Sequence, residues 1–280
     1  MGYNTKETAE TMHSFLEKGM PRYMDILRDM VRINSFTLNP DGVNRLADFT
    51  AGVFRDLGFA DERVQSINPS YGKHLVLSRT GKSPIVIGCV SHLDTVFSPE
   101  EEERNNFRWR IDGDRIYGPG TEDIKGGTVV LLMTLEALKH AAPEAFDSVN
   151  WSLLMDASEE TESVDFGNLC RERLGADALG CLIFEAGRIR DNIFSVVTSR
   201  KGRAELRITA EGKGAHSGVS HKKGASAIAQ MADVIGRIEA ITDYKHELTV
   251  NVGRIAGGSQ INRVPHFAEA HAEMRAFSPA

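Results

Sequence analysis

Short apolar runs that alternate with segments of helical periodicity constrain the fold of this chain most. The apolar runs are HLVLS at residues 74–78, PIVIGCV at 84–90, NWSLLMDAS at 150–158 and GCLIFEAG at 180–187. Helical spacing predicts helices over residues 20–33, 43–57 (ended by Gly58), 124–140 and near 166–174. Strands that are apolar on both faces and alternate with helices indicate a mainly parallel sheet covered by helices. The predicted fold class is therefore α/β.

The pattern changes near residue 198. After it come an alternating strand-like segment KGRAELRITAEG, a helical segment GASAIAQMADVIGRIEAI, and two further strand-like segments, HELTVNVGRIAGG and HFAEAHAEMRAF. This β-α-β-β order indicates a second, smaller α+β domain. We therefore predict two domains, residues 1–197 and residues 198–280. The acidic cluster at residues 99–106 is interpreted as a solvated loop.

The composition argues against several classes of partner. The formal net charge of −6 disfavours nucleic acid and anionic membranes, because both select for basic patches. There is no run of about 18 apolar residues that would span a bilayer. The N-terminus lacks the apolar segment of a secretory signal, and Cys89 and Cys181 lie in apolar runs that suit buried, reduced thiols. We therefore predict a cytoplasmic protein.

Polar residues follow the apolar runs where buried strands are expected to end. The run at 84–90 continues as SHLDTVF, which places His92 and Asp94 two residues apart. Along an extended strand, residues i and i+2 point the same way, so the two side chains project together. A metal-binding histidine commonly donates its other ring N–H to a carboxylate, a role that Asp94 could fill. Taken alone, the pair is better explained by a hydrogen-bonded histidine at a strand end, with Asp94 capping a turn.

Further carboxylates occupy comparable positions. In GPGTEDIKGG, residues 118–127, the glycines allow a tight turn and a helix start, with Asp123 near the helix N-terminus. In LLMDASEETES, Glu159 and Glu160 point to opposite sides of an extended segment, so one could bind a metal while the other accepts a proton. Glu185 ends the run LIFEAG. Each group by itself could equally be a helix cap or a solvated acidic loop.

Together these residues favour a metal site. Reactive groups gather at the carboxyl ends of the strands in α/β sheets. One histidine with several carboxylates is a hard-to-intermediate ligand set, suited to two divalent ions that share a bridging carboxylate. Such pairs of ions activate water for hydrolysis. The sequence therefore predicts a hydrolytic site with two metal ions.

The chain resembles the zinc-dependent aminoacylase/carboxypeptidase family in four motifs, which occur in the order VSHLDTVF, YGPGTEDIKGG, DASEETES and LIFEAG. That family includes glutamate carboxypeptidase, acetylornithine deacetylase and succinyl-diaminopimelate desuccinylase. The resemblance covers essentially the whole chain, and G-x-G-x-x-D-x-K-G-G is its most specific part. It implies a zinc-peptidase-like catalytic domain with an inserted lid and dimerisation domain, and hence a homodimer.

The resemblance also implies the metal ligands. His92 and Glu185 would bind one zinc ion, Glu160 would bind the second, and Asp123 would bridge both. The peptide bond between Asp123 and Ile124 would be cis. The expectation is two zinc ions per subunit, although carboxylate-rich sites also accept cobalt or manganese.

Catalytic and substrate-binding roles follow from the same resemblance. Glu159 would be the general base, and Asp94 would orient the zinc-binding histidine. His216, in GKGAHSG, would reach the partner subunit's site and polarise the scissile carbonyl. Asn262 and Arg275 would hold the carboxylate of the substrate, a task for which the planar fork of arginine is suited.

The leading hypothesis is a metal-dependent hydrolase that cleaves an amide bond in a small N-acyl amino acid or a short peptide with a free carboxylate. In the family, the catalytic domain resumes after the lid and supplies a last histidine ligand. We expect that this chain, which ends at FSPA in lid-like sequence, is truncated and has weak or absent activity alone. One alternative is an inactive truncated homologue that binds a ligand or dimerises. A less favoured one is a different two-metal hydrolase, such as a phosphatase.

Overall fold

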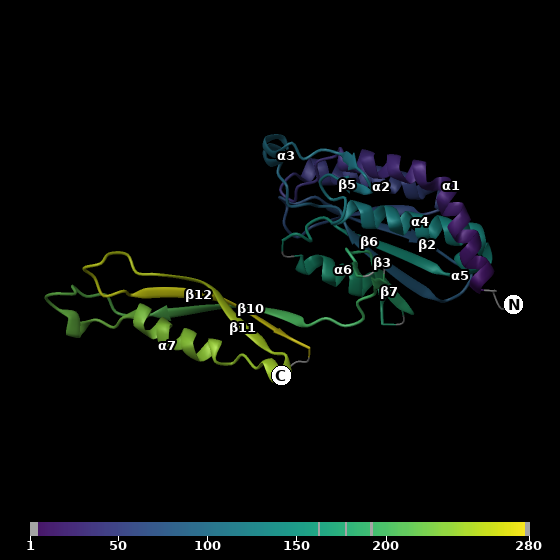
Figure 1. The fold of residues 1–280 in the computed structure, drawn as a ribbon. Coiled ribbons are helices and arrows are strands. Elements are labelled where there is room, and N and C mark those ends of the chain that lie inside the picture. Colours follow the sequence, from purple (N-terminus) through teal and green to yellow (C-terminus); the bar gives the residue numbers. More distant parts are fainter. Residues whose placement is uncertain (1–4, 162, 177, 191–192, 278–280) are drawn as a thin grey trace. The chain divides into compact units, whose positions relative to one another are not determined.

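The computed structural model describes residues 5–161, 163–176, 178–190 and 193–277. The chain divides into two compact units, unit 1 (residues 1–186) and unit 2 (residues 187–280), each with its own sheet (Figure 1). The elements of unit 1 are α1 (Thr5–Val31), α2 (Pro40–Phe54), the 3₁₀ helix η1 (Arg55–Leu57), β1 (Ala60–Gln65), β2 (Lys73–Arg79), β3 (Val86–His92), α3 (Pro99–Asn105), β4 (Arg110–Asp112), β5 (Arg115–Tyr117), α4 (Lys125–Ala141), α5 (Pro143–Ser148), β6 (Asn150–Asp156), α6 (Val164–Leu174) and β7 (Gly180–Ile183).

The sheet of unit 1 confirms the predicted α/β class. Its five strands have the order β1-β2-β6-β3-β7, and β3 runs parallel to both β6 and β7. On the other side, β2 is antiparallel to β6 and β1 is antiparallel to β2. The short connection at residues 66–72 permits only antiparallel pairing of β1 with β2, because a parallel pair needs a long crossover. The sheet is therefore mixed, with the parallel strands on the side that carries the candidate site.

Helices cover both faces of this sheet (Figure 1). Alternate residues of β6 point to opposite faces. Leu153 and Met155 join the large core beneath α1, α2 and α4, whereas Leu154 packs with Phe166 and Leu169 of α6 on the other face. At roughly 25 cal/mol per Å² of apolar surface removed from water, burial of such side chains on both faces stabilises the three-layer arrangement.

Some local predictions are corrected by the structure. The acidic cluster is not a loop but the helix α3, because Ser98 accepts a hydrogen bond from the N–H of Glu101 as its N-cap and Pro99 occupies the first turn. Cys181 is exposed on β7 and is not a buried thiol, whereas Cys89 is buried. Gly58 ends the second predicted helix in the left-handed conformation, as expected.

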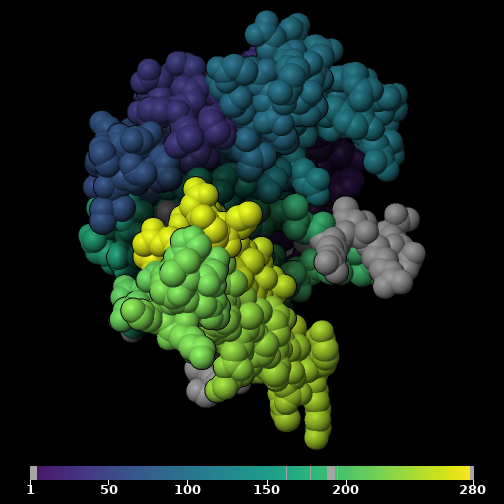
Figure 2. Space-filling model, turned by 90° about the vertical axis from the view of Figure 1, so that its left-hand side faces the viewer, coloured from purple at the N-terminus to yellow at the C-terminus, as the bar shows by residue number. Residues whose placement is uncertain are grey.

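Unit 2 has the predicted β-α-β-β order, preceded by a two-stranded ribbon. Its elements are β8 (Arg188–Arg190), β9 (Ile193–Ser195), β10 (Gly202–Glu211), η2 (His221–Lys223), α7 (Ala227–Glu239), η3 (Tyr244–His246), β11 (Thr249–Gly257) and β12 (Phe267–Ala276). The antiparallel sheet has the order β10-β12-β11. One face packs on α7 through a small core that includes Met231 and several alanines, and the opposite face is charged. Figure 2 shows the surface of this unit in green to yellow. None of the helices in the described ranges is long and apolar enough to cross a membrane.

Candidate metal centre

The candidate site lies at the carboxyl ends of three strands of unit 1. β3 ends at His92, β6 ends at Asp156 and leads to Glu159 and Glu160, and β7 ends shortly before Glu185. Because β6, β3 and β7 are parallel neighbours, their carboxyl ends meet at one edge of the sheet. The structure thus brings together residues that are far apart in the sequence.

The distances within this group are short. His92 Nε2 lies 2.9 Å from Asp123 Oδ1, 3.7 Å from Glu185 Oε1 and 3.9 Å from Glu159 Oε2. His92, Asp123 and Glu160 each offer one ligand atom, and these atoms lie within 4.8 Å of one another. Four predicted carboxylates, those of Asp123, Glu159, Glu160 and Glu185, therefore lie close to the imidazole of His92 or to one another.

Asp123 reaches this edge because α4 starts very close to the sheet. The peptide bond between Asp123 and Ile124 is cis, as the resemblance implied, and α4 begins at Lys125. A Cβ added to Gly127 would lie only 2.0 Å from the backbone oxygen of Phe184, so only glycine permits this approach. The first turn of α4 therefore packs directly on the end of β7, beside Glu185.

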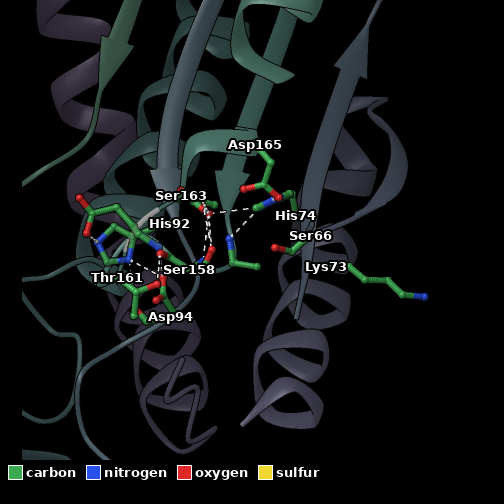
Figure 3. Close-up of polar contacts among 12 residues, drawn as sticks. Ser66, Lys73, His74, His92, Asp94, Ser158, Thr161, Ser163 and Asp165 are labelled. Atoms are coloured by element: carbon green, nitrogen blue, oxygen red, sulfur yellow. Dashed lines mark hydrogen bonds and ion pairs between the residues drawn. The ribbon is translucent and has the colours of Figure 1, made fainter. Parts of the chain in front are cut away.

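Asp94 contacts the imidazole differently from what the sequence suggested. His92 Nδ1 lies 3.0 Å from the backbone oxygen of Asp94 and 3.4 Å from its carboxylate. The carboxylate, which is fully buried, accepts hydrogen bonds from Thr37 Oγ1 at 2.6 Å, from Glu159 N at 3.0 Å and from Glu160 N at 3.2 Å. A buried carboxylate needs such donors. Asp94 thus holds the backbone of the glutamate pair as well as lying beside the histidine (Figure 3).

The titratable groups of the cluster perturb one another. Burial lowers the pKa of His92, but the hydrogen bond and charge of Asp94 and the charges of nearby glutamates outweigh it and raise this pKa to about 9. Burial, reinforced by the charge of Asp123, raises the pKa of Glu160 to about 7. Burial also raises the pKa of Glu159, although the charge of His92 opposes it. The cluster therefore concentrates more negative charge than one imidazole balances.

This donor set fits a divalent cation. An imidazole nitrogen and carboxylate oxygens are the ligands of zinc sites, and the same oxygens suit manganese. The side chains of Asp123 and Glu159 are 58% and 52% exposed, so a cation and a small substrate have access to them. His92, Asp123, Glu160 and Glu185 are the residues that would hold the metal.

The remaining predicted residues, His216, Asn262 and Arg275, belong to unit 2 and are described within that unit. The segments of His216 and Asn262 lie side by side, because Ser217 N donates to Asn262 O at 3.0 Å. His216 Nδ1 accepts hydrogen bonds from the N–H groups of two residues in its own loop. Arg275 lies at the opposite end of β12, where its guanidinium Nε is 2.6 Å from Glu273 Oε1. Unit 2 therefore brings two of its three predicted residues together and leaves the third apart.

Comparison with known proteins agrees with the resemblance seen in the motifs. Residues 198–280 match the model of a peptidase dimerisation domain. The chain is 28% identical to carboxypeptidase G2 of Pseudomonas sp. (strain RS-16) over 256 residues, which are 91% of this chain and 60% of the relative. It is 26% identical to the acetylornithine deacetylase of Klebsiella pneumoniae (strain 342), over 93% of this chain and 69% of the relative. The chain thus spans less than two thirds of the length of carboxypeptidase G2.

Solved structures share the fold. The aminopeptidase PepT of Bacillus cereus superposes with a TM-score of 0.72 at 24% identity, over 92% of this chain and 67% of that one. A metallo-carboxypeptidase of the M20 family from Sulfolobus solfataricus superposes with a TM-score of 0.66 at 17% identity, over 91% and 71% of the two chains. The chain is thus similar in fold to an M20 metallo-carboxypeptidase, and its residues 198–280 match the dimerisation domain of peptidases.

Sequence reasoning missed three buried residues whose hydrogen bonds support the candidate site. Thr37, His74 and Asp156 are buried and make hydrogen bonds that reach Asp94 or the segment before Glu159. The one signal for His74 was its position at the start of the apolar run HLVLS, where a buried histidine must have polar partners. Asp156 and Thr37 carry no comparable signal, since aspartate and threonine are common at strand ends and turns.

Proposed function

We propose that this protein is a metal-dependent hydrolase that cleaves an amide bond in a small N-acyl amino acid or a short peptide with a free carboxylate. The observation that carries the proposal is the convergence of ligand atoms from His92, Asp123 and Glu160 within 4.8 Å. The relatedness to a carboxypeptidase and a deacetylase supports the substrate class. When held by these side chains, a divalent cation supplies positive charge that polarises a carbonyl group and acidifies water.

Glu159 is the proposed general base. Its carboxylate lies 3.9 Å from His92 Nε2 and its side chain is half exposed, so it reaches both the cluster and incoming water. Burial raises its pKa, which makes the carboxylate a better proton acceptor. It takes a proton from the water whose oxygen bonds to the carbonyl carbon. The same carboxyl group then protonates the leaving amine as the C–N bond breaks.

The proposal also gives roles to three residues of unit 2, on the basis of the motif resemblance. His216 would stabilise negative charge on the carbonyl oxygen, and Asn262 and Arg275 would bind the carboxylate of the substrate. Within unit 2, Arg275 is paired with Glu273, so a substrate carboxylate would have to replace that partner. The planar guanidinium can make the same bidentate contact with either carboxylate.

Finer features of the proposal are the metal and the assembly. We propose zinc, with two ions per subunit in the complete site, because one histidine among several carboxylates is an intermediate ligand set. The match of residues 198–280 to a peptidase dimerisation domain supports a homodimer formed through unit 2. A cytoplasmic location stays a prediction from the sequence.

The variant Glu159→Gln tests this function, because it keeps the shape of the side chain and removes the base. The zinc-supplied protein is assayed for amine release from a panel of N-acyl amino acids and dipeptides. We expect the variant to bind zinc as the wild type does and to lose turnover by about 10²–10⁴-fold. The matched control is Glu144→Gln on α5. Glu144 is exposed and precedes the start of β6, whereas Glu159 follows the end of that strand, so the control should leave turnover unchanged.

Two results would contradict the proposal: a wild-type protein without affinity for zinc, or full turnover in the Glu159 variant. A wild type that binds zinc but hydrolyses nothing in the panel favours the alternative of a homologue that binds a ligand or dimerises without catalysis.

A further inference from the structure

Behind the candidate metal centre lies a buried polar network around His74, which the proposed mechanism does not use. His74 is the second residue of β2 and is 1% exposed. Its Nε2 lies 3.1 Å from Asp165 Oδ2, and its Nδ1 lies 3.1 Å from the backbone nitrogen of Ala157 and 3.2 Å from Asp156 Oδ1. Figure 3 shows His74 and His92 on different strands, with Ser158 and Ser163 between them. An imidazole buried this deeply has to be hydrogen bonded.

The network ties three separate segments together. Asp165, in the first turn of α6, accepts hydrogen bonds from His74 and from the N–H of Ile67 at 2.7 Å. Asp156, at the end of β6, accepts from the N–H of Ser158 at 2.9 Å and from Ser163 Oγ at 2.8 Å. His74 therefore joins the start of α6 to the segment that follows β6.

That segment carries the glutamate pair, and side chains hold four of its backbone N–H groups in succession. The N–H of Ala157 donates to His74 Nδ1 and the N–H of Ser158 donates to Asp156. The next two, those of Glu159 and Glu160, donate to the carboxylate of Asp94, which lies on the side of His92. A strand end normally leaves such groups to water. Here the backbone of the two glutamates and of the two residues before them is fixed by His74 and Asp156 on one side and by Asp94 on the other.

We propose that His74 is a positioning residue: it fixes the backbone of residues 157–160 and thereby directs Glu160 towards His92 and Asp123. The metal-binding consequence rests on the proposed function, whereas the effect on the backbone does not. His74 keeps hydrogen bonds to this segment, directly or through Asp156, in both protonation states of its ring. A neutral ring accepts the N–H of Ala157 and donates through Nε2 to Asp165. A protonated ring donates to Asp165 and, through Nδ1, to Asp156, which in turn holds Ser158.

Two substitutions and one control separate positioning from general packing. His74→Leu removes every hydrogen bond of the ring, whereas His74→Asn can place its Oδ1 where Nδ1 accepts from Ala157. The control is Val76→Ala: Val76 lies two residues along the same strand, on the same face, is buried, and packs with Leu154 and Phe166 without polar contacts of its side chain. Its cost in stability comes from packing alone.

The first readout is amide hydrogen exchange of the metal-free protein, which needs no activity. We expect His74→Leu to accelerate exchange at residues 157–160 by about fivefold or more, since a hydrogen bond that holds the segment is lost. His74→Asn should show a smaller acceleration, and Val76→Ala should leave these amides at wild-type rates. Equal acceleration in the leucine variant and the valine control, or none in either His74 variant, overturns the proposal. If His74→Leu does not fold, the asparagine variant against the control decides the same question.

The second readout is zinc affinity by calorimetry. We expect His74→Leu to bind zinc roughly tenfold more weakly, in the range seen when residues behind metal ligands are changed, and Val76→Ala to bind as the wild type does. A wild type that binds no zinc refutes the proposed function, while the exchange result still decides whether His74 holds the segment. Unchanged zinc affinity in both His74 variants overturns the positioning role.

Discussion

The candidate residues of the two units differ in how they are held. In unit 1, His92 and Asp94 are buried, and Asp94 alone accepts three hydrogen bonds from outside its own segment. In unit 2, His216 is exposed and its side chain accepts hydrogen bonds from its own loop, and Arg275 pairs with a glutamate two residues away on the same strand. His92 and Asp94 of unit 1 are therefore preorganised, whereas His216 and Arg275 of unit 2 are held by contacts that a ligand can replace.

This difference suggests a division of labour. A metal site needs ligands held within a few tenths of an ångström, which buried hydrogen bonds provide. Recognition of a substrate carboxylate tolerates a side chain that changes its partner on binding. Substitutions at the candidate residues of unit 1 should therefore alter metal affinity, and substitutions at those of unit 2 should not.

The largest expected effect is on zinc affinity, when one histidine in each unit is replaced by alanine. His92→Ala should abolish zinc binding, because it removes the only imidazole among the ligand atoms that converge in the described residues. His216→Ala should bind zinc with wild-type affinity and lose only turnover. Calorimetric titration with zinc measures the first effect, and amine release measures the second. Loss of zinc binding in both variants would mean that the two regions share a single site.

A smaller effect should separate the stability of the two units. Met231 is the largest side chain of the buried core of unit 2 and is 0% exposed, so Met231→Ala should cost about 2–5 kcal/mol of that unit's unfolding free energy. Both tryptophans, Trp109 and Trp151, lie in unit 1, so their fluorescence reports that unit alone. In urea denaturation of Met231→Ala, the circular dichroism signal of unit 2 should therefore change at a lower urea concentration than in the wild type. The fluorescence transition of unit 1 should keep its wild-type midpoint. A fluorescence transition that shifts equally would show that the units unfold together.

The contrast between the units also shows what the sequence could reveal. The candidate cluster of unit 1 was predictable, because parallel strands bring their carboxyl ends to one edge whatever the details of packing. Strands β3 and β6 were predictable from their long apolar runs. β1, with the sequence ADERVQ, was not, since it is a polar edge strand defined only by its pairing with β2.

Residues that act through tertiary contacts were beyond prediction. The partners of His74 lie more than eighty positions away, at Asp156, Ala157 and Asp165, and their contact depends on the register of β2 against β6. No local pattern encodes that register. Asp94 shows the same limit: its spacing from His92 predicted the neighbour, whereas its bonds to Glu159 and Glu160 required the fold.

The smallest expected effect is a difference in the pH dependence of stability. Burial lowers the pKa of His74, but hydrogen bonds and charges from Asp156 and Asp165 outweigh it and raise this pKa above its usual value of about 6.5. A raised folded pKa means that the ion-pair contribution of His74 to stability is complete below the unfolded pKa and is lost as pH rises through the folded one, while the hydrogen bonds of the neutral ring stay. In unit 2, hydrogen bonds from His271 and Arg207 lower the pKa of Glu269, so its contribution is lost as pH falls through the folded pKa.

The stability contributions of His74 in unit 1 and of Glu269 in unit 2 should therefore depend on pH with opposite sign. The stability difference between wild type and His74→Asn, measured by fluorescence, should shrink between pH 6 and alkaline pH, whereas the difference for Val76→Ala should stay constant. The difference for Glu269→Gln, measured by circular dichroism, should shrink as the pH falls below about 4.3. Because the partners of Glu269, Arg207 and His271, are exposed, solvent screens its ion pairs, and this second effect should be weaker and reduced by salt. A His74 difference that grows with pH would mean that the neutral ring, through its bond to Ala157, stabilises the segment more than the ion pairs do.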